Sequence, residues 1–176
     1  MGRWLSLFVI CFFSTAFLVS AAEHTTKGKK TGLPIPRFAS LRSSKINIRT
    51  GPSERHPIIW VYQRKNYPVE IIAEFENWRK IRDLDGTQGW VHESLLIGKQ
   101  HALIINNKFV EANQFNAKLP ATQVLLYRSP DELSYPLLRA EIGVIGRIVN
   151  CKLEWCQLQI EGHKAWIRKV NLWGVR

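Results

Sequence analysis

The chain has 176 residues, and its 25 Lys and Arg residues against 14 Asp and Glu residues give a formal net charge of +11. This length suits one ordinary domain or two small ones, and it excludes a larger set of domains. The positive charge favours an anionic partner such as nucleic acid, lipid head groups or a carboxylate-bearing wall polymer.

Residues 1–22 have the pattern of a secretory signal peptide. Arg3 supplies a positive charge, residues 4–19 form an apolar run, and Ser20, Ala21 and Ala22 offer the small side chains that signal peptidase requires. An uncleaved membrane anchor is the alternative, but the run is barely long enough to span a bilayer. We therefore expect a periplasmic or secreted protein with no integral membrane segment after cleavage. Export makes nucleic acid the least expected anionic partner.

Residues 23–38 have the composition of a basic, proline-containing linker. Residues 27–32 are cationic and contain two glycines, whereas residues 33–37 contain two prolines that favour extended backbone. This composition predicts a tether rather than a docking motif.

The remaining chain contains one pattern twice. Trp78-Arg79-Lys80-Ile81 and Gly89-Trp90-Val91 recur as Trp155-Cys156-Gln157-Leu158 and Ala165-Trp166-Ile167. The tryptophans of each pair are twelve and eleven residues apart, a difference that a turn absorbs. Upstream, Arg49-Thr50-Gly51-Pro52 of the first copy corresponds to Arg128-Ser129-Pro130 of the second, which aligns Arg49 with Arg128. We predict two tandem modules with Trp78 and Trp155, and Trp90 and Trp166, on equivalent strands.

Each module has the pattern of an all-β domain. Val69, Ile71 and Ala73 alternate with Glu70, Ile72 and Glu74. Residues 83–87 and 161–163 are turn-forming stretches with a glycine. No window outside residues 1–22 has helical periodicity, which favours small barrels or sandwiches. Between the modules, residues 102–105 and 109–110 flank Asn106-Asn107. We expect a connecting hairpin within residues 99–118 that packs the modules together in a fixed arrangement.

The first copy resembles the bacterial SH3-like domain family. The resemblance rests on Asn47-Ile48-Arg49-Thr50-Gly51-Pro52, Trp78-Arg79-Lys80-Ile81 and Gly89-Trp90-Val91-His92. It implies a first barrel at residues 39–98 and a degenerate second barrel at residues 119–176, in which Ala165 replaces the glycine before the tryptophan. The family implies partly open barrels of five to seven strands, no cofactor, and binding of peptidoglycan or peptides by exported proteins.

Cys151 and Cys156 are the cysteines that remain after signal cleavage, and an even number in an exported protein favours a disulfide. Four residues separate them, so they would face each other at the base of a hairpin. A zinc site with His163 is an alternative, but it lacks a fourth ligand and the usual spacing. A nucleophilic cysteine beside His163 would need a free thiol in an oxidising compartment.

The carboxylates and the other histidines do not form a catalytic pattern. Asp83 and Asp85 belong to a predicted turn, where solvation opposes the raised pKa that acid–base catalysis needs, and Glu93 lies nearby. His56, His92 and His101 have no metal-ligand spacing, and we assign them no role. We therefore predict a protein with no catalytic residues, no metal site and no enzymatic activity.

Aromatic and basic residues of the first module form the predicted ligand site. Ile81 is the natural core position of its strand, so Trp78, Lys80 and Arg82 share the opposite face. The groove would be completed by four further aromatic residues, namely Trp60, Tyr62, Tyr67 and Trp90. The alternative is that these rings only cover barrel ends or the interface between modules, and this packing role is favoured for Trp90 and Trp166. With Trp78 and Trp155, the two interpretations are equally supported.

Two functions of different class follow from these patterns. The first is a non-enzymatic exported module that binds a cell-wall polymer, or a peptide or protein ligand. The second is a structural or assembly factor of the cell envelope whose grooves are buried between its own barrels.

Overall fold

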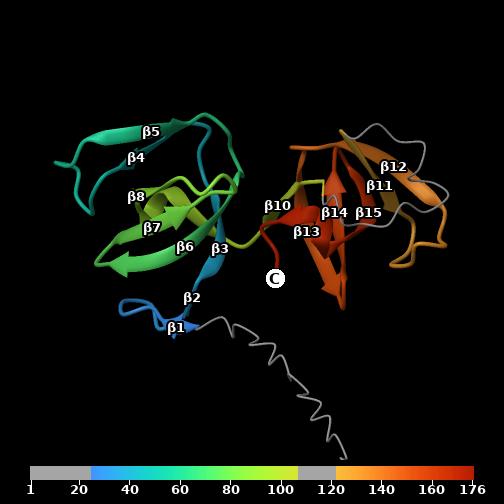
Figure 1. Ribbon diagram of the computed structural model, residues 1–176, viewed down its shortest axis with the longest axis horizontal. Coiled ribbons are helices and arrows are strands. Elements are labelled where there is room, and N and C mark those ends of the chain that lie inside the picture. The colour runs from blue at the N-terminus through green and yellow to red at the C-terminus, as the bar shows by residue number, and fades with distance from the viewer. Residues whose placement is uncertain (1–24, 107–121) are drawn as a thin grey trace, which may run out of the picture.

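The computed structural model describes residues 25–106 and 122–176, which form two β-barrels that follow each other in the chain (Figure 1). The predicted signal peptide lies outside these residues. The first barrel contains β3 (Arg37–Leu41), β4 (Ile46–Arg49), β5 (Ile58–Tyr62), β6 (Pro68–Phe75), β7 (Trp78–Arg82), β8 (Gln88–His92), η1 (Glu93–Leu95) and β9 (Leu96–Gly98). The second contains β10 (His101–Ile104), β11 (Gln123–Tyr127), β12 (Pro136–Glu141), β13 (Ile145–Lys152), β14 (Trp155–Ile160), β15 (His163–Arg168), η3 (Lys169–Asn171) and β16 (Leu172–Trp173). The all-β prediction with two tandem barrels is confirmed.

The two seven-stranded sheets have the same topology. Their strand orders are β5-β4-β8-β7-β6-β3-β9 and β12-β11-β15-β14-β13-β10-β16, so each strand of one sheet has a counterpart in the other. Trp78 and Trp155 begin the counterpart strands β7 and β14. Trp90 pairs with Lys80, and Trp166 pairs with Gln157, at the same distance along these strands. The predicted equivalence of the tryptophans is confirmed.

The predicted alignment of Arg49 with Arg128 is wrong by one residue. Arg49 pairs with Trp90, whereas the residue that pairs with Trp166 is Tyr127. Both β4 and β11 have a register shift immediately before this residue, so the two strands share the same irregularity and the pairing fixes the correspondence. Arg49 of the first barrel therefore corresponds to Tyr127 of the second.

Each barrel has its own apolar core. Leu41, Ile48, Val69, Ile81 and Val91 are central in the first. Ile104, Leu126, Cys156, Leu158 and Ile167 are central in the second. These positions alternate with more exposed neighbours along their strands, as a period of two requires.

Gly89 has a steric role at the crossing of β4 and β8. A Cβ atom there would lie 2.2 Å from Ile48 Cγ2. In the second barrel the corresponding Ala165 is fully buried, so that barrel does accommodate a methyl group.

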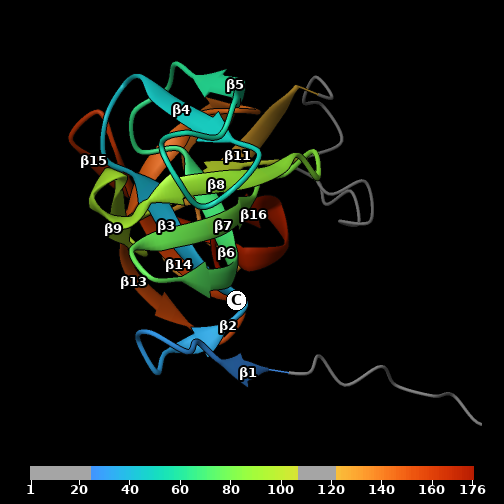
Figure 2. The ribbon, with the colours of Figure 1, turned by 90° about the vertical axis from the view of Figure 1, so that its left-hand side faces the viewer.

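The predicted linker is folded in the described residues 25–38. β1 (Thr26–Lys27) and β2 (Pro34–Ile35) pair as a hairpin, which Figures 1 and 2 show beside β3 and β6. The backbone N–H groups of Lys30 and Thr31 donate to Glu74 Oε2 at 3.1 and 3.0 Å. The structure thus differs from the expected tether, because a carboxylate more than forty residues away anchors the hairpin.

The predicted connecting hairpin is also different. Its first half is β10, which pairs with β13 and β16 as a strand of the second sheet. Its second half, residues 109–110, lies outside the described residues.

Direct contacts join the barrels. Trp173 Nε1 donates to the carbonyl of Pro68 at 3.2 Å, and the Trp173 ring meets Phe38 edge-on with centroids 5.0 Å apart. Arg176, near the C-terminus between the barrels in Figure 1, pairs with Glu70 and lies over the Phe38 ring. Among the described residues, no helix is long and apolar enough to cross a membrane.

Candidate ligand-binding site

A cavity of about 310 Å³ opens beside Trp78 on the first barrel. Its polar lining comes from Asn47 and Arg49 of β4, from His92 at the end of β8, and from Lys45 and Glu54 in the neighbouring loops. All lining residues belong to the first barrel, so the cavity is not a product of the contact between barrels.

The strand β7 positions the Trp78 ring. Arg79 and Ile81 are buried, with exposed fractions of 3% and 1%, whereas Trp78, Lys80 and Arg82 alternate with them and are half-buried. Trp78 faces His92 across the β7–β8 pair, and the rings meet edge-on with centroids 5.6 Å apart. The expected division of this strand into two faces is present.

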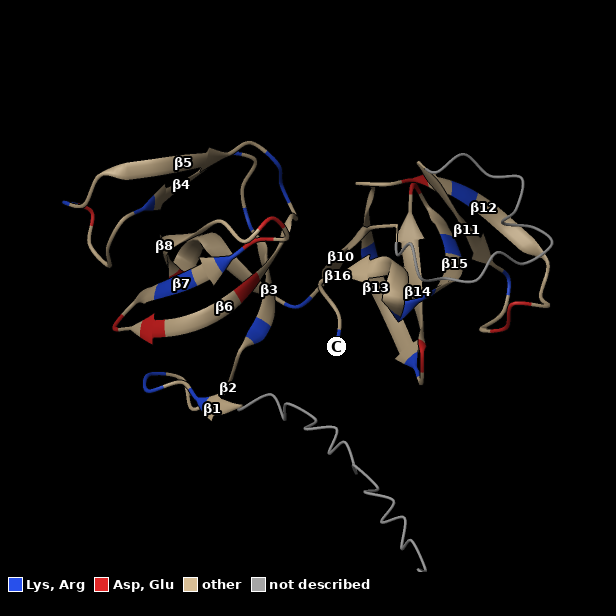
Figure 3. Cartoon of the chain, viewed as in Figure 1, with Lys and Arg blue, Asp and Glu red and all other residues tan. Residues whose placement is uncertain are grey.

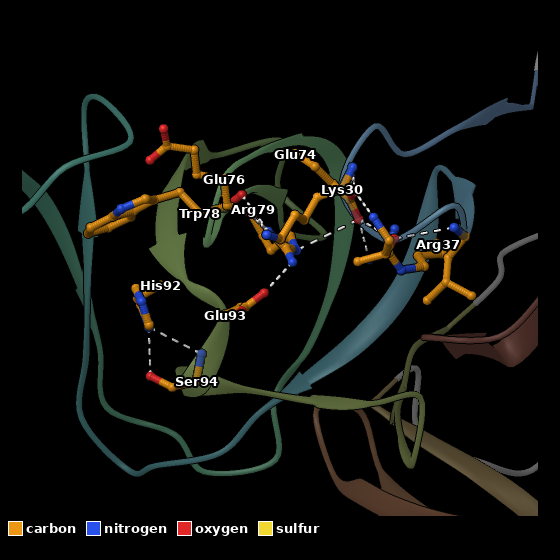
Figure 4. Close-up of polar contacts among 11 residues, drawn as sticks. Lys30, Arg37, Glu74, Glu76, Trp78, Arg79, His92, Glu93 and Ser94 are labelled. Atoms are coloured by element: carbon orange, nitrogen blue, oxygen red, sulfur yellow. Dashed lines mark hydrogen bonds and ion pairs between the residues drawn. The ribbon is translucent and has the colours of Figure 1, made fainter.

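His92 is held in place by the turn that follows it. The backbone N–H of Ser94 donates to His92 Nδ1 at 3.3 Å, and the Ser94 hydroxyl lies 2.8 Å from the same nitrogen (Figure 4). His92 had no predicted role, although its cross-strand pairing with Trp78 could have been derived from the hairpin spacing.

Arg49 is a second residue of this cavity that was not among the predicted site residues. Its Nη1 donates to the carbonyl of His56 at 2.7 Å, which ties β4 to the loop leading into β5. With Lys45 it places two cationic side chains around the same cavity as Trp78. Arg49 belongs to the motif that carried the family resemblance, but no local signal indicated that it would lie near Trp78.

The structure separates Arg82 from Trp78. Arg82 pairs with the buried Glu70 and lines another cavity, of about 430 Å³, together with Phe38 and Trp173 at the contact between the barrels. Figure 3 shows the basic colour on β7 beside the acidic colour on β6. Lys80 faces Trp90 on β8 and forms no ion pair within the described residues. The cations that line the cavity beside Trp78 are therefore Arg49 and Lys45.

Tyr62 and Tyr67 belong to the wall of the core. Tyr62 is 9% exposed, its hydroxyl donates to Asp83 Oδ2 at 2.5 Å, and its ring stacks on Tyr67 with centroids 5.6 Å apart. Burial raises the pKa of Tyr62, and the hydrogen bond to Asp83 raises it further. Burial and the charge of Asp83 also raise the pKa of Tyr67. These phenols stay protonated and support the barrel.

Trp60 has a different environment on the edge strand β5. It is 54% exposed, and its neighbours Ile58 and Ile59 are exposed as well. Trp90 is half-buried, whereas its counterpart Trp166 is buried. Of the predicted aromatic groove, the structure brings only Trp78 to the polar cavity, and Trp60 stands on the free edge of the sheet.

The predicted solvated turn contains a buried carboxylate. Asp83 is 5% exposed, and its Oδ1 accepts from the backbone N–H groups of Asp85 and Thr87. The turn position is as expected, but the solvation is not, because Tyr62 covers the other carboxylate oxygen. Asp83 thus serves the turn and the core.

A chain of ion pairs crosses the first barrel on the side of β7 opposite Trp78 (Figure 4). Glu74 accepts from Arg37 at 2.6 Å and lies 3.7 Å from Arg79 Nε, and Arg79 also pairs with Glu93. Burial alone would raise the pKa of Glu74, but hydrogen bonds from Thr31, Arg37 and Lys30 together lower it to about 2. This carboxylate is permanently ionised at neutral pH and cannot act as a general acid.

Cys151 and Cys156 form the predicted disulfide, with Cα atoms 4.0 Å apart on the paired strands β13 and β14. The bridge uses both thiols, so the zinc and nucleophile alternatives would first require its reduction. In residues 25–106 and 122–176, no group of three or more His, Cys, Asp or Glu residues could hold a metal ion.

The surroundings of Trp155 in the second barrel differ from those of Trp78 in the first. The Tyr127 ring, which corresponds to Arg49, meets Trp155 edge-on with centroids 5.7 Å apart. Arg168 pairs with Glu132 at 2.7 Å beside this ring pair. An aromatic ring therefore takes the position of Arg49, while Arg168, which is paired with Glu132, takes the position of His92.

Comparison with known families finds that the family model described as Bacterial SH3 domain matches residues 42–98 and 121–174. No curated protein matches the chain. Similar solved structures include NlpC1 and NlpC2 from Trichomonas vaginalis, each 10% identical, with TM-scores of 0.31 and 0.33. The alignments cover 83% and 78% of this chain and 48% of each of those chains. An NlpC/P60 family protein from Bacillus cereus ATCC 10987 is 12% identical, with a TM-score of 0.32 and coverage of 77% and 55%. The chain spans about half the length of these proteins.

Proposed function

Because the chain belongs to the bacterial SH3 domain family, we propose that it is a non-enzymatic binding protein of the cell envelope. Its ligand is a component of the cell wall, either peptidoglycan or a wall-attached peptide, which the first barrel binds at the cavity beside Trp78. Bacterial SH3 domains are commonly cell-wall binding modules, which supports this compartment and this class of ligand.

The observation that carries the proposal is the grouping of Trp78, Arg49 and Lys45 around one cavity. An indole ring offers a rigid apolar face for a sugar ring or a peptide side chain, at little cost in conformational entropy. A guanidinium group binds a carboxylate through two hydrogen bonds, and a lysine adds a second positive charge. Peptidoglycan has sugars and stem-peptide carboxylates close together, so its chemistry matches both parts of the cavity.

The environments of the acidic residues support a non-enzymatic role. Glu74 and Glu93 form ion pairs, and Asp83 accepts hydrogen bonds that fix a turn. General acid catalysis needs a carboxyl group whose pKa is raised, whereas the pKa of Glu74 is lowered to about 2.

A structural factor with grooves buried between its own barrels is the second candidate. The aromatic contact between the barrels involves Phe38 and Trp173, not Trp78. The Trp78 cavity is lined by the first barrel alone, which favours binding of an external ligand.

The test is sedimentation of the purified protein with purified peptidoglycan sacculi at several salt concentrations. Trp78→Ala should remove most of the bound fraction, while the matched variant Trp155→Ala should retain it, because the second barrel has Tyr127 in place of Arg49. Circular dichroism must show that both variants are folded. If Trp78→Ala is folded and still sediments like the unaltered protein, the proposed site is wrong.

A further inference from the structure

A third cavity, of about 440 Å³, lies between the N-terminal hairpin and the first barrel. Thr31 and Leu33 of the hairpin loop line one side, and residues of β3 and β9 line the other. The cavity is separate from the one beside Trp78, because Arg79 lines the new cavity and successive residues of a strand point to opposite faces.

The cavity has an apolar part and a cationic end. Leu33, Ile71, Leu96 and Ile97 provide apolar surface. β3 and β9 are antiparallel, and Ala39 pairs with Gly98. The residues before Ala39 on β3, including Arg37, therefore lie at the same end of the pair as Lys99, which follows Gly98. Arg37 and Lys99 thus lie at the same end of the β3–β9 pair, and both line the cavity.

The charges at this end are not balanced by the protein. Arg37 and Arg79 share Glu74, and Arg79 also neutralises Glu93, so two cations face two carboxylates. Lys99 forms no ion pair within the described part of the chain. Partial burial lowers the pKa of Lys99, and the nearby Lys169 of the second barrel lowers it further. An anion placed here would relieve this repulsion.

We infer that this cavity binds a small carboxylate ligand with an apolar body. The carboxylate lies at Lys99 and Arg37, and the apolar body lies against Leu33, Ile71 and Ile97. The cavity volume falls in the range of about 300–1,000 Å³ that is usual for sites of small molecules. This inference goes beyond the proposed function, because it concerns a different cavity and a monomeric, amphiphilic ligand rather than the wall polymer.

Isothermal titration calorimetry with decanoate, below the concentration at which it forms micelles, tests the inference on the whole protein. We expect binding of one decanoate, and weaker binding of the uncharged decanol. Lys99→Gln should weaken decanoate binding by about tenfold, because it removes the unbalanced cation. Lys164→Gln, which removes an exposed lysine outside the cavity, should leave the affinity unchanged.

A second variant tests the apolar part without changing any charge. A Cβ atom at Gly98 would meet no atom within 4 Å, and Gly98 has no positive φ angle, so Gly98→Leu is compatible with the fold. Because cross-strand partners point to the same side of a sheet, the new side chain would enter the cavity beside Ala39 and block it.

Two results would overturn the inference. The first is no measurable binding of decanoate, or binding no stronger than that of decanol. The second is an unchanged decanoate affinity in folded Lys99→Gln and Gly98→Leu variants. Trp78→Ala keeps the two proposals apart, since it should remove most of the sedimentation with sacculi and leave decanoate binding intact.

Discussion

Glu74 and Arg79 are cross-strand partners on β6 and β7, at the position that the disulfide between Cys151 and Cys156 occupies in the second barrel. In the first barrel this position connects the hairpin of residues 25–35 to Glu93 through ion pairs and hydrogen bonds. In the second barrel, the disulfide joins β13 and β14, which correspond to β6 and β7. The equivalent pair of strands is thus linked by an ion pair in the first barrel and by a disulfide in the second.

The disulfide should stabilise the second barrel by about 2 kcal/mol, because it closes a short loop in the unfolded chain. We expect the double variant Cys151→Ala/Cys156→Ala to lower the free energy of unfolding by this amount in urea titrations. The unaltered, unreduced protein should have no titratable thiol at these positions. Free Cys151 and Cys156 thiols in the purified, unreduced protein would contradict the assignment.

Glu74 should make stability depend on acid pH. Its pKa is about 2 in the folded state and near the ordinary 4.5 in the unfolded chain. As pH falls, the unfolded chain binds the proton first, so this stabilisation is complete above about 4.5 and is lost between 4.5 and 2. Its upper limit is about 3 kcal/mol, from the size of the pKa difference.

The measurement is urea unfolding of Glu74→Gln between pH 2 and 7. The variant should be less stable than the unaltered protein at pH 7, and the difference should disappear near pH 2. Hydrogen exchange should show faster exchange at Lys30 and Thr31 in the variant, because their N–H groups lose an acceptor. The exposed Glu141→Gln is the matched control. A stability difference that is constant over this pH range would contradict the role of the Glu74 charge.

Arg49 should contribute to wall binding in a salt-dependent way. Arg49→Gln is expected to reduce the bound fraction at low salt and to have less effect at high salt, since the Debye length is about 10 Å at 0.1 M. Arg128→Gln changes the residue that the sequence aligned with Arg49, and it should have no effect, because Tyr127 occupies the equivalent position. Equal losses in both variants would indicate a general effect of net charge.

Trp173 should couple the two barrels. Trp173→Ala removes the ring contact with Phe38 and the hydrogen bond to Pro68, and we expect a loss of about 2 kcal/mol in stability. Scanning calorimetry should then separate the unfolding of the two barrels. Trp60→Ala, which removes an exposed ring, is the control and should change stability little. An unchanged single transition in Trp173→Ala would show that this contact does not couple the barrels.

The sequence by itself determined the features that depend on neighbours along the chain. Alternating apolar residues and glycine-containing turns predicted the strands around Trp78 and Trp155, and four intervening residues predicted the bridge between Cys151 and Cys156. These features are local, because strand periodicity and hairpin closure involve residues a few positions apart.

Only the tertiary structure decided which distant side chains meet. Glu74 lies 43 residues from Thr31, so composition alone predicted a tether where the chain forms an anchored hairpin. The pairing of β4 with β8 places Arg49 in the same cavity as Trp78, and the pairing of β11 with β15 places Tyr127 against Trp155. These contacts depend on how the strands pair across the barrel, and the hydrophobic periodicity of the sequence does not predict that pairing.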